Sequence, residues 1–262
     1  MCMGKPTMPP VTATIITFNE EDRIAGAIAS LSCCDEILVV DSGSTDRTCQ
    51  IAANRGARVI TRAWDGYSKQ KNFAAEQAKN DWILSMDADE RLSIELADAI
   101  VREFGGARVR QGEASRVDAR MAAYSMPRRA FYLGRWIRHS GWYPDRKIRL
   151  YDRRRCRWEG DFVHEGLKVD GAAQPLRGDL LHFPYRSWSD HVARIKKYTE
   201  LAAAGARSSG QRGSVLKLIL APPLTFIRSF LLHAGFLDGW RGAAIAYMGA
   251  RYVFMREFRI LH

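Results

Sequence analysis

The sequence has few cysteines and lacks the common glycine-rich phosphate-binding motifs. Its five cysteines show no metal-ligand spacing and form no disulfide framework, which predicts a reducing compartment. No G-x-G-x-x-G motif follows the first expected strand, and no G-x-x-x-x-G-K-[S/T] motif is present, which argues against a dinucleotide-dependent oxidoreductase and a P-loop NTPase. Residues 1–10 hold three prolines and no apolar run, so we do not expect them to act as a signal peptide.

Acidic residues are outnumbered, with 29 Asp and Glu against 40 Lys and Arg, for a formal net charge of +11. Much of the excess lies between Arg108 and Arg157. This balance favours an anionic partner, which leaves open nucleic acid, a phospholipid surface or a phosphorylated substrate. A nucleic-acid-binding protein is the less favoured alternative, because no base-stacking motif or recognition-helix pattern is present.

The first hundred residues alternate strand and helix patterns. Runs of β-branched and apolar residues predict strands at 11–17, 36–41, 58–61 and 82–87. Helices are expected from a cap at Asn19, from a cap at Thr45 or Asp46 to Gly56, at 69–78, and from Ser93 to Phe104. Repeated strand–helix units predict an α/β fold with a Rossmann-like, mostly parallel central sheet flanked by helices.

The pattern changes along the chain and suggests three regions. We expect an N-terminal tail at 1–10, a catalytic domain at 11–206 and C-terminal helices at 214–262. Within the catalytic domain, 11–104 would be the nucleotide-binding half and 123–206 the acceptor half.

The C-terminal helices mix large apolar and aromatic residues with arginine, which is typical of helices that lie in a membrane interface. Pro222 and Pro223 are expected to interrupt them, which argues against a simple membrane span. The alternative is that these helices cover the core of the catalytic domain.

Acidic residues follow three of the predicted parallel strands, at the edge of the sheet where ligands bind. The strand over 11–17 leads into Glu20, the strand over 36–41 ends at Asp41, and the strand over 82–87 leads into Asp87 and Asp89. Carboxylates gathered at one edge repel each other unless a cation or a donor-rich ligand joins them. Oxygen ligands select hard ions such as Mg²⁺ or Mn²⁺, so Asp87 and Asp89 predict a divalent-metal site.

These motifs resemble those of family 2 glycosyltransferases, which have the GT-A fold. The similarity is carried by Ile15–Glu21, by the run Val39–Thr48 that contains Asp-Ser-Gly-Ser-Thr-Asp, and by Asp87-Ala88-Asp89-Glu90. Later segments, Trp158–Gly160 with His164-Glu165, Leu181-His182, and Gly235–Gly239, are similar to the subgroup of lipopolysaccharide core glucosyltransferases.

The resemblance implies a role for each of several residues. Thr17, Asn19 and Glu20 would line the nucleotide pocket, Asp41 would bind the uracil ring, Lys71 would lie by the base and phosphates, Asp87 would meet the ribose, and Asp89 would bind the metal. His182 would complete the metal shell, although a single histidine after an apolar strand is more often structural. Lys71 taken by itself reads equally as a solvated charge on a helix.

An inverting transfer also needs a base that takes the proton of the acceptor hydroxyl. The resemblance assigns this role to Glu165, with Asp161 as the alternative, while an ion pair with a neighbouring arginine is the purely structural interpretation of Glu165.

The donor implied is a UDP-sugar, with UDP-glucose favoured, and the acceptor is a lipid-linked glycan such as the lipopolysaccharide inner core. A polyprenyl phosphate acceptor and a non-catalytic sugar-nucleotide binder remain alternatives. The expected location is the cytoplasmic face of the inner membrane, on an anionic surface.

Overall fold

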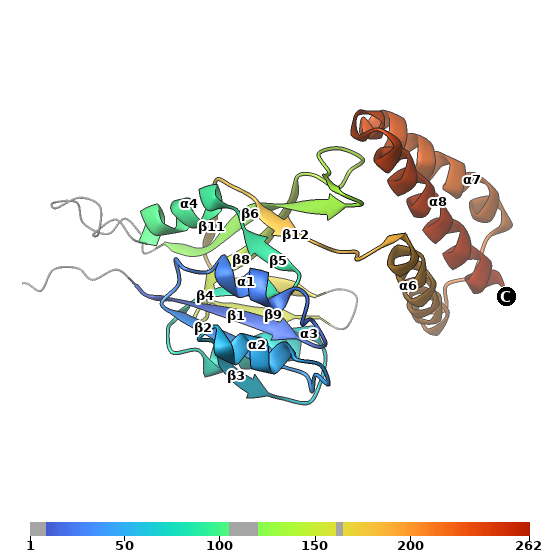
Figure 1. Ribbon diagram of the computed structural model, residues 1–262. Helices are drawn as coiled ribbons and strands as arrows, with labels where there is room; N and C mark the ends of the chain where they lie inside the picture. The colour runs from blue at the N-terminus through green and yellow to red at the C-terminus, as the bar shows by residue number, and fades with distance from the viewer. Residues whose placement is uncertain (1–8, 105–119, 161–164) are drawn as a thin grey trace, which may run out of the picture. The chain divides into compact units, whose positions relative to one another are not determined.

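The computed structural model describes residues 9–104, 120–160 and 165–262 (Figure 1). Contacts within the chain divide it into two compact units. Unit 1 comprises Met1–Arg128 and Arg146–His182, and unit 2 comprises Arg129–Asp145 and Phe183–His262. Unit 1 contains the motifs that carry the family resemblance, and unit 2 contains the helical tail.

Four parallel strands form the first half of the sheet in unit 1. They are β1 (Val11–Thr17), β2 (Glu36–Asp41), β3 (Arg58–Thr61) and β4 (Trp82–Asp87), in the spatial order β3-β2-β1-β4. Their ranges match the four predicted strands. The Rossmann-like arrangement expected from the strand–helix alternation is therefore confirmed.

The second half of the sheet is mixed. It contains β5 (Glu90–Leu92), β6 (Met121–Tyr132), β8 (Asp145–Asp152), β11 (Ala172–Pro175) and β12 (Leu180–His182). Strand β8 runs antiparallel to β4, and β12 runs antiparallel to β5. The antiparallel direction of β8 brings its first residues beside the carboxyl end of β4. A separate two-stranded sheet pairs β9 (Cys156–Glu159) with β10 (Gly166–Val169).

Helices cover both faces of the parallel strands, and β1 is therefore buried on both sides. On one face Ala13 and Ile15 join a core cluster with residues of α1 (Ile24–Ala29), α2 (Thr48–Asn54) and α4 (Ile94–Phe104). On the other face Ile16 packs with Ala74 of α3 (Tyr67–Gln77). This burial on two sides suits the β-branched and small residues of β1, which include three buried threonines, Thr12, Thr14 and Thr17.

Two predicted helix starts were wrong. Asn19 does not cap α1, since its φ of 54° is left-handed, and the helix begins at Ile24 after Arg23. The Asn19 side chain instead accepts a hydrogen bond from the Thr45 backbone N–H at 2.8 Å. Helix α2 begins at Thr48, two residues beyond Asp46. Tertiary hydrogen bonds between the two loops thus outweigh the local capping preference.

Two predicted helix boundaries are confirmed. Gly56 has a φ of 82° directly after the end of α2, a left-handed conformation that glycine adopts without steric cost. Ser93 precedes α4, and its hydroxyl accepts a hydrogen bond from the Leu96 N–H at 3.2 Å.

Unit 2 is built from helices around an aromatic cluster. It contains β7 (Arg135–Trp136), α6 (Trp188–Ser208), α7 (Val215–Ile227), the short helices η1 (Arg228–Leu232) and η2 (Gly235–Asp238), and α8 (Trp240–Leu261). Tyr132, Ile137 and Ile245 form the buried centre of the cluster. The Tyr132 hydroxyl lies 2.8 Å from His191 Nδ1.

The expected interruption of the tail at the two prolines was wrong. Helix α7 runs through Pro222 and Pro223, and the irregular η1 segment begins only at Arg228. The fixed φ of proline suits a helix, so the cost lies in the two hydrogen bonds that the rings cannot donate. The segment Val215–Leu232 is long and apolar enough to cross a membrane by length and composition, and none of it is buried.

Candidate functional site

The carboxyl ends of β1, β2 and β4 meet at one edge of the sheet in unit 1. Thr17 lies opposite Asp41 of β2, and Ile16 lies opposite Asp87 of β4. The parallel register therefore brings the predicted residues Thr17, Asp41 and Asp87 to neighbouring positions, as the strand–helix pattern requires.

Two cations hold the Asp87 carboxylate. Arg149 Nη2 lies 2.6 Å from Asp87 Oδ2, and Lys71 Nζ lies 3.5 Å from Asp87 Oδ1. Burial alone would raise the pKa of Asp87, but the positive charges of Arg149 and Lys71 outweigh it and hold that pKa well below its ordinary value. Asp87 is therefore ionised at neutral pH, although much of its negative charge is already compensated.

Lys71 is a buried charge on α3 rather than a solvated one. Its side chain is 1% exposed, and Nζ lies 2.9 Å from Glu165 Oε1. The ammonium group also lies 4.5 Å from the centre of the Trp158 ring, within the range of a cation–π contact. Lys71 thus links the two carboxylates, Asp87 and Glu165, that the sequence analysis assigned to the donor and to the acceptor.

Asp89 faces different partners from Asp87. His182 Nε2 lies 3.5 Å from Asp89 Oδ2, and Arg23 Nη1 lies 3.9 Å from the same oxygen. The pairing of β12 with β5 places His182 opposite Glu90, next to Asp89 along the chain. Across residues 9–104, 120–160 and 165–262, no group of three or more His, Cys, Asp or Glu side chains could hold a metal ion.

The loops after β1 and β2 are joined by hydrogen bonds. Asp41 is 1% exposed, and its carboxylate accepts bonds from the backbone N–H groups of Gly43 and Ser44 at 2.9 and 2.8 Å. The Ser44 hydroxyl accepts a bond from the Asn19 N–H at 2.8 Å, and the Thr48 hydroxyl accepts one from the Glu20 N–H at 2.9 Å. These bonds fix Asn19 and Glu20 beside Asp41.

Three buried polar atoms near these residues have no hydrogen-bond partner among the residues that the structure describes. They are Thr17 Oγ1, Gln70 Oε1 and Arg149 Nε. Gln70 is fully buried on α3, and its Nε2 donates to Ser42 Oγ and to the Arg62 carbonyl, both at 3.2 Å. Buried polar groups almost always have a hydrogen-bond partner, so atoms without one are expected where a ligand supplies it.

The buried ion network behind Asp87 was not predicted from the sequence. Glu90 is fully buried, and its Oε1 lies 2.7 Å from Arg149 Nη2 and 3.4 Å from Arg128 Nη1. Its second oxygen accepts the Asp87 backbone N–H at 3.1 Å. One signal was available: Glu90 directly follows the two aspartates. Arg149 lies in a strand whose last four residues are buried, but its partner depends on the pairing of β8 with β4, which no local pattern reveals.

The alternative base, Asp161, lies outside the described residues. Glu165 is described and lies one residue before β10. Of the two candidates, the structure therefore gives contacts for Glu165 alone.

Comparison with known proteins decides the family. The family model "Glycosyl transferase family 2" matches residues 12–161, which include every strand of the parallel half of the sheet and both aspartates. The chain belongs to glycosyltransferase family 2. The α/β fold with GT-A architecture expected from the resemblance is confirmed, and the protein is a glycosyltransferase.

Relatives of the glycosyltransferase extend over nearly its whole length. It is 32% identical to the lipopolysaccharide core biosynthesis glycosyltransferase LpsC of Rhizobium meliloti, over 95% of this chain and 93% of the relative. It is also 32% identical to RT0209, an uncharacterized glycosyltransferase of Rickettsia typhi, over 97% of this chain and 88% of the relative. Both alignments include the helical tail, so unit 2 is shared with these relatives.

Among solved structures, the chain is similar to glucosyl-3-phosphoglycerate synthase from Mycobacterium tuberculosis, crystallised with Mn²⁺, UDP and glucosyl-3-phosphoglycerate. The identity is 23% and the TM-score 0.34, over 48% of this chain and 45% of the other. A similarity of this size does not extend to ligands or reaction.

Proposed function

We propose that this glycosyltransferase moves a sugar from a UDP-sugar, with UDP-glucose as the favoured donor, to a hydroxyl of a lipid-linked glycan such as the lipopolysaccharide inner core. The observation that carries the proposal is that Asp87 and Asp89, at the carboxyl edge of the sheet, have different partners. Asp87 is held by Arg149 and Lys71, whereas Asp89 faces His182. The similarity to LpsC over 95% of the chain supports the acceptor class.

The donor nucleotide would bind between the loops after β1 and β2. Thr17, Asn19, Glu20 and Asp41 lie there, with Lys71 and Asp87 on the next elements. The carboxylate of Asp41 is already bonded to the N–H groups of its own loop. Both of those bonds go to Oδ2, and Oδ1 accepts the Ser44 hydroxyl, so the uracil ring would donate to the remaining lone pair of Oδ1.

A divalent ion, Mg²⁺ or Mn²⁺, fits the donor set at Asp89. Asp89 and His182 offer one carboxylate and one imidazole within 3.5 Å of each other, and Asp87 lies two residues before Asp89. Because the described residues offer no group of three ligands, the donor diphosphate would complete the coordination. When bound, such an ion supplies positive charge against the departing diphosphate.

Glu165 would act as the base of an inverting transfer. The Lys71 ammonium group pairs with the Glu165 carboxylate and holds it in position, with Nζ 2.9 Å from Oε1. An ionised carboxylate within reach of an acceptor hydroxyl can take its proton as the new glycosidic bond forms. Asp161 remains the alternative base.

The tail would attach the enzyme to the cytoplasmic face of the inner membrane. Helix α7 has no buried residue, and it exposes Val215, Leu216, Ile219, Leu220, Leu224 and Ile227. Trp240, Tyr247, Phe254 and Phe258 of α8 are also exposed. Large apolar and aromatic side chains next to arginines are the composition of helices that bind an anionic membrane surface.

A donor panel tests the proposal. Membranes that contain the acceptor are incubated with the purified enzyme, labelled UDP-sugars and Mn²⁺ or Mg²⁺, and the labelled product is identified. Label in a lipid-linked glycan supports the proposal, whereas label in a polyprenyl phosphate sugar would establish the alternative acceptor. Nucleic-acid retention without UDP binding would point to a nucleic-acid-binding protein, and UDP binding without transfer would point to a non-catalytic binder.

A further inference from the structure

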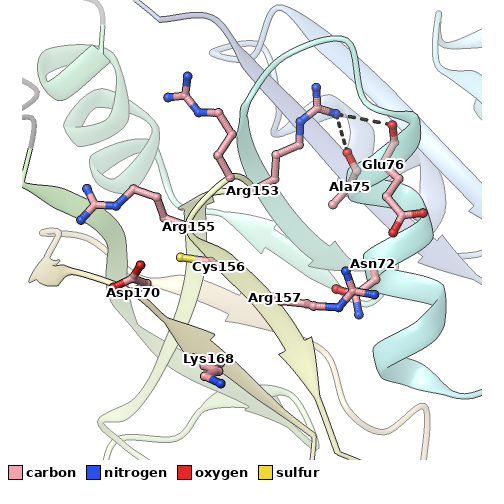
Figure 2. A pocket seen from close by; sticks show the side chains of 10 residues that line it. Asn72, Ala75, Glu76, Arg153, Arg155, Cys156, Arg157, Lys168 and Asp170 are labelled. Carbon is pink, nitrogen blue, oxygen red and sulfur yellow. Dashed lines mark hydrogen bonds between the residues drawn. The ribbon is translucent and has the colours of Figure 1, made fainter.

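A basic cavity of about 370 Å³ lies in unit 1, apart from Asp87 and Asp89 (Figure 2). Five basic residues line it: Arg153, Arg154, Arg155, Arg157 and Lys168. Glu76 and Asp170 are the acidic residues of the lining. The cavity is formed by the end of α3, the turn between β8 and β9, and the two-stranded sheet of β9 and β10.

Three of the arginines have structural partners, and one of them, Arg155, donates through Nη1 to the Met121 carbonyl at 3.4 Å. Arg153 Nη1 donates to the carbonyls of Ala75 and Ala78 at 2.7 and 2.8 Å, which satisfies the last turn of α3. Arg154 Nη2 lies 2.6 Å from Asp152 Oδ2. These interactions hold the Arg153 and Arg154 side chains in the wall of the cavity.

Arg157 and Lys168 are placed differently. They lie directly opposite each other in the antiparallel pair of β9 and β10, on its exposed face. Like charges in such a cross-strand pair destabilise a sheet. Lys168 Nζ lies 3.6 Å from Glu159 Oε1, and both side chains of that pair are more than half exposed. An anion between Arg157 and Lys168 would offset their repulsion.

The cavity is joined to the candidate active site through α3 and Trp158. Asn72 lines the cavity, and its side chain bonds the Trp158 backbone through Nδ2 to the carbonyl at 2.9 Å and Oδ1 to the N–H at 3.0 Å. Lys71, the residue before Asn72 on α3, lies over the Trp158 ring. Figure 2 shows Arg157 extending from β9 toward the side of α3 that carries Asn72.

We propose that this cavity binds a phosphate group carried by a sugar or by a lipid head group. Two exposed cations that lie opposite each other on β9 and β10 suit the charge of a phosphate ester, and an anion can replace the exposed 3.6 Å contact of Lys168 with Glu159. Charge-assisted hydrogen bonds are the strong ones. The site is separate from the donor site, and the proposal does not depend on the donor or on catalysis.

The test compares two variants that lose the same charge. Arg157→Gln combined with Lys168→Gln removes the two cations, and Arg55→Gln combined with Arg102→Gln removes two exposed cations from helices elsewhere in unit 1. Each protein is titrated calorimetrically with glucose 6-phosphate in EDTA, with glucose as the uncharged control. In a second arm, flotation is measured with vesicles of phosphatidylcholine alone or mixed with phosphatidylglycerol.

We expect the Arg157/Lys168 variant to bind glucose 6-phosphate about tenfold more weakly, or to lose its preference for phosphatidylglycerol, while the Arg55/Arg102 variant stays like the natural protein. A loss in the first arm assigns the phosphate to a sugar, and a loss in the second assigns it to a lipid. Asp89→Asn should change neither, since the donor site is separate. The proposal is overturned if neither probe binds, or if both double variants behave alike in both arms.

Discussion

Lys71, which is buried, and Glu165, which is partly exposed, form an ion pair in which Nζ lies 2.9 Å from Oε1. The two residues come from α3 and from the segment before β10, 94 positions apart in the chain. Lys71 also reaches Asp87 at 3.5 Å, so one ammonium group joins the proposed base to the proposed donor site. This contact makes Glu165 a fixed carboxylate rather than a mobile surface charge.

Replacing Glu165 by Gln should lower turnover by about a hundredfold or more, the scale of general-base catalysis. Binding of UDP should change little, because the change removes a proton acceptor and leaves the nucleotide contacts. Steady-state kinetics and calorimetry measure the two effects. Asp65→Asn is the matched control, because Asp65 is an exposed carboxylate paired with Lys69. Normal turnover in Glu165→Gln would move the role to Asp161 or to another carboxylate.

Replacing Arg149 by Met should destabilise the enzyme by about 3 kcal/mol, since it leaves Glu90 buried without its nearer cation. UDP affinity should fall as well, because Arg149 positions Asp87. Adding Glu90→Gln should recover part of the stability but not the UDP affinity. Urea unfolding and calorimetry measure both quantities. If the single and the double variant were both as stable as the natural protein, the buried network would have no structural role.

Acid pH should lower the folding stability of the protein through His191, which lies in unit 2. Burial lowers the pKa of His191 from 6.5 to about 4, so the folded protein keeps the ring neutral. Between these values the unfolded chain binds a proton that the folded chain does not, so stability falls as pH drops from about 6.5 toward 4. The loss should reach about 3 kcal/mol, from about 1.4 kcal/mol per unit of pKa difference.

The test measures urea unfolding at pH 7.5 and at pH 4.5 for the natural protein and for His191→Gln. Glutamine can still bond the Tyr132 hydroxyl, which lies 2.8 Å from His191 Nδ1 in the structure. The variant should lose part of the acid sensitivity. An equal loss of stability in both proteins would assign the acid sensitivity to other groups.

Membrane binding should depend on the exposed face of α7. Leu216, Leu220 and Leu224 are 67%, 48% and 61% exposed and recur every four residues, so they lie on one side of the helix. Changing all three to Gln should abolish flotation with anionic vesicles without changing UDP binding. Changing Tyr198 and Leu201 of α6, which are similarly exposed, is the control. Undiminished flotation of the triple variant would place the membrane contact elsewhere.

The parallel half of the sheet could be predicted because its information is local. Val11–Thr17 and Glu36–Asp41 are buried on both faces and read as runs of β-branched and apolar residues, and a parallel sheet brings their ends together by necessity. The helix starts after Asn19 and Asp46 could not be predicted, because both side chains bond the neighbouring loop: Asn19 accepts from Thr45, and Asp46 accepts from the Glu21 N–H at 3.2 Å.

The contacts of Asp87 and Asp89 depend on strand pairing. The family resemblance had placed His182 in the metal shell with Asp89, but the sequence did not predict Arg149 beside Asp87. Arg149 reaches Asp87 because β8 pairs antiparallel with β4. His182 reaches Asp89 because β12 pairs with β5. Both pairings connect segments far apart in the sequence, and nothing in the local pattern of either segment specifies the other.

The measurement that tests the account most directly is calorimetric titration with UDP, with and without Mn²⁺. It compares the natural protein with Asp89→Asn, and with Asp98→Asn, a control on α4, away from the site. We predict that Mn²⁺ strengthens UDP binding at least about tenfold in the natural protein and in Asp98→Asn, and not in Asp89→Asn, which should also lose transfer. Equal strengthening by Mn²⁺ in all three proteins would contradict the assignment of Asp89 to the metal that carries the donor diphosphate.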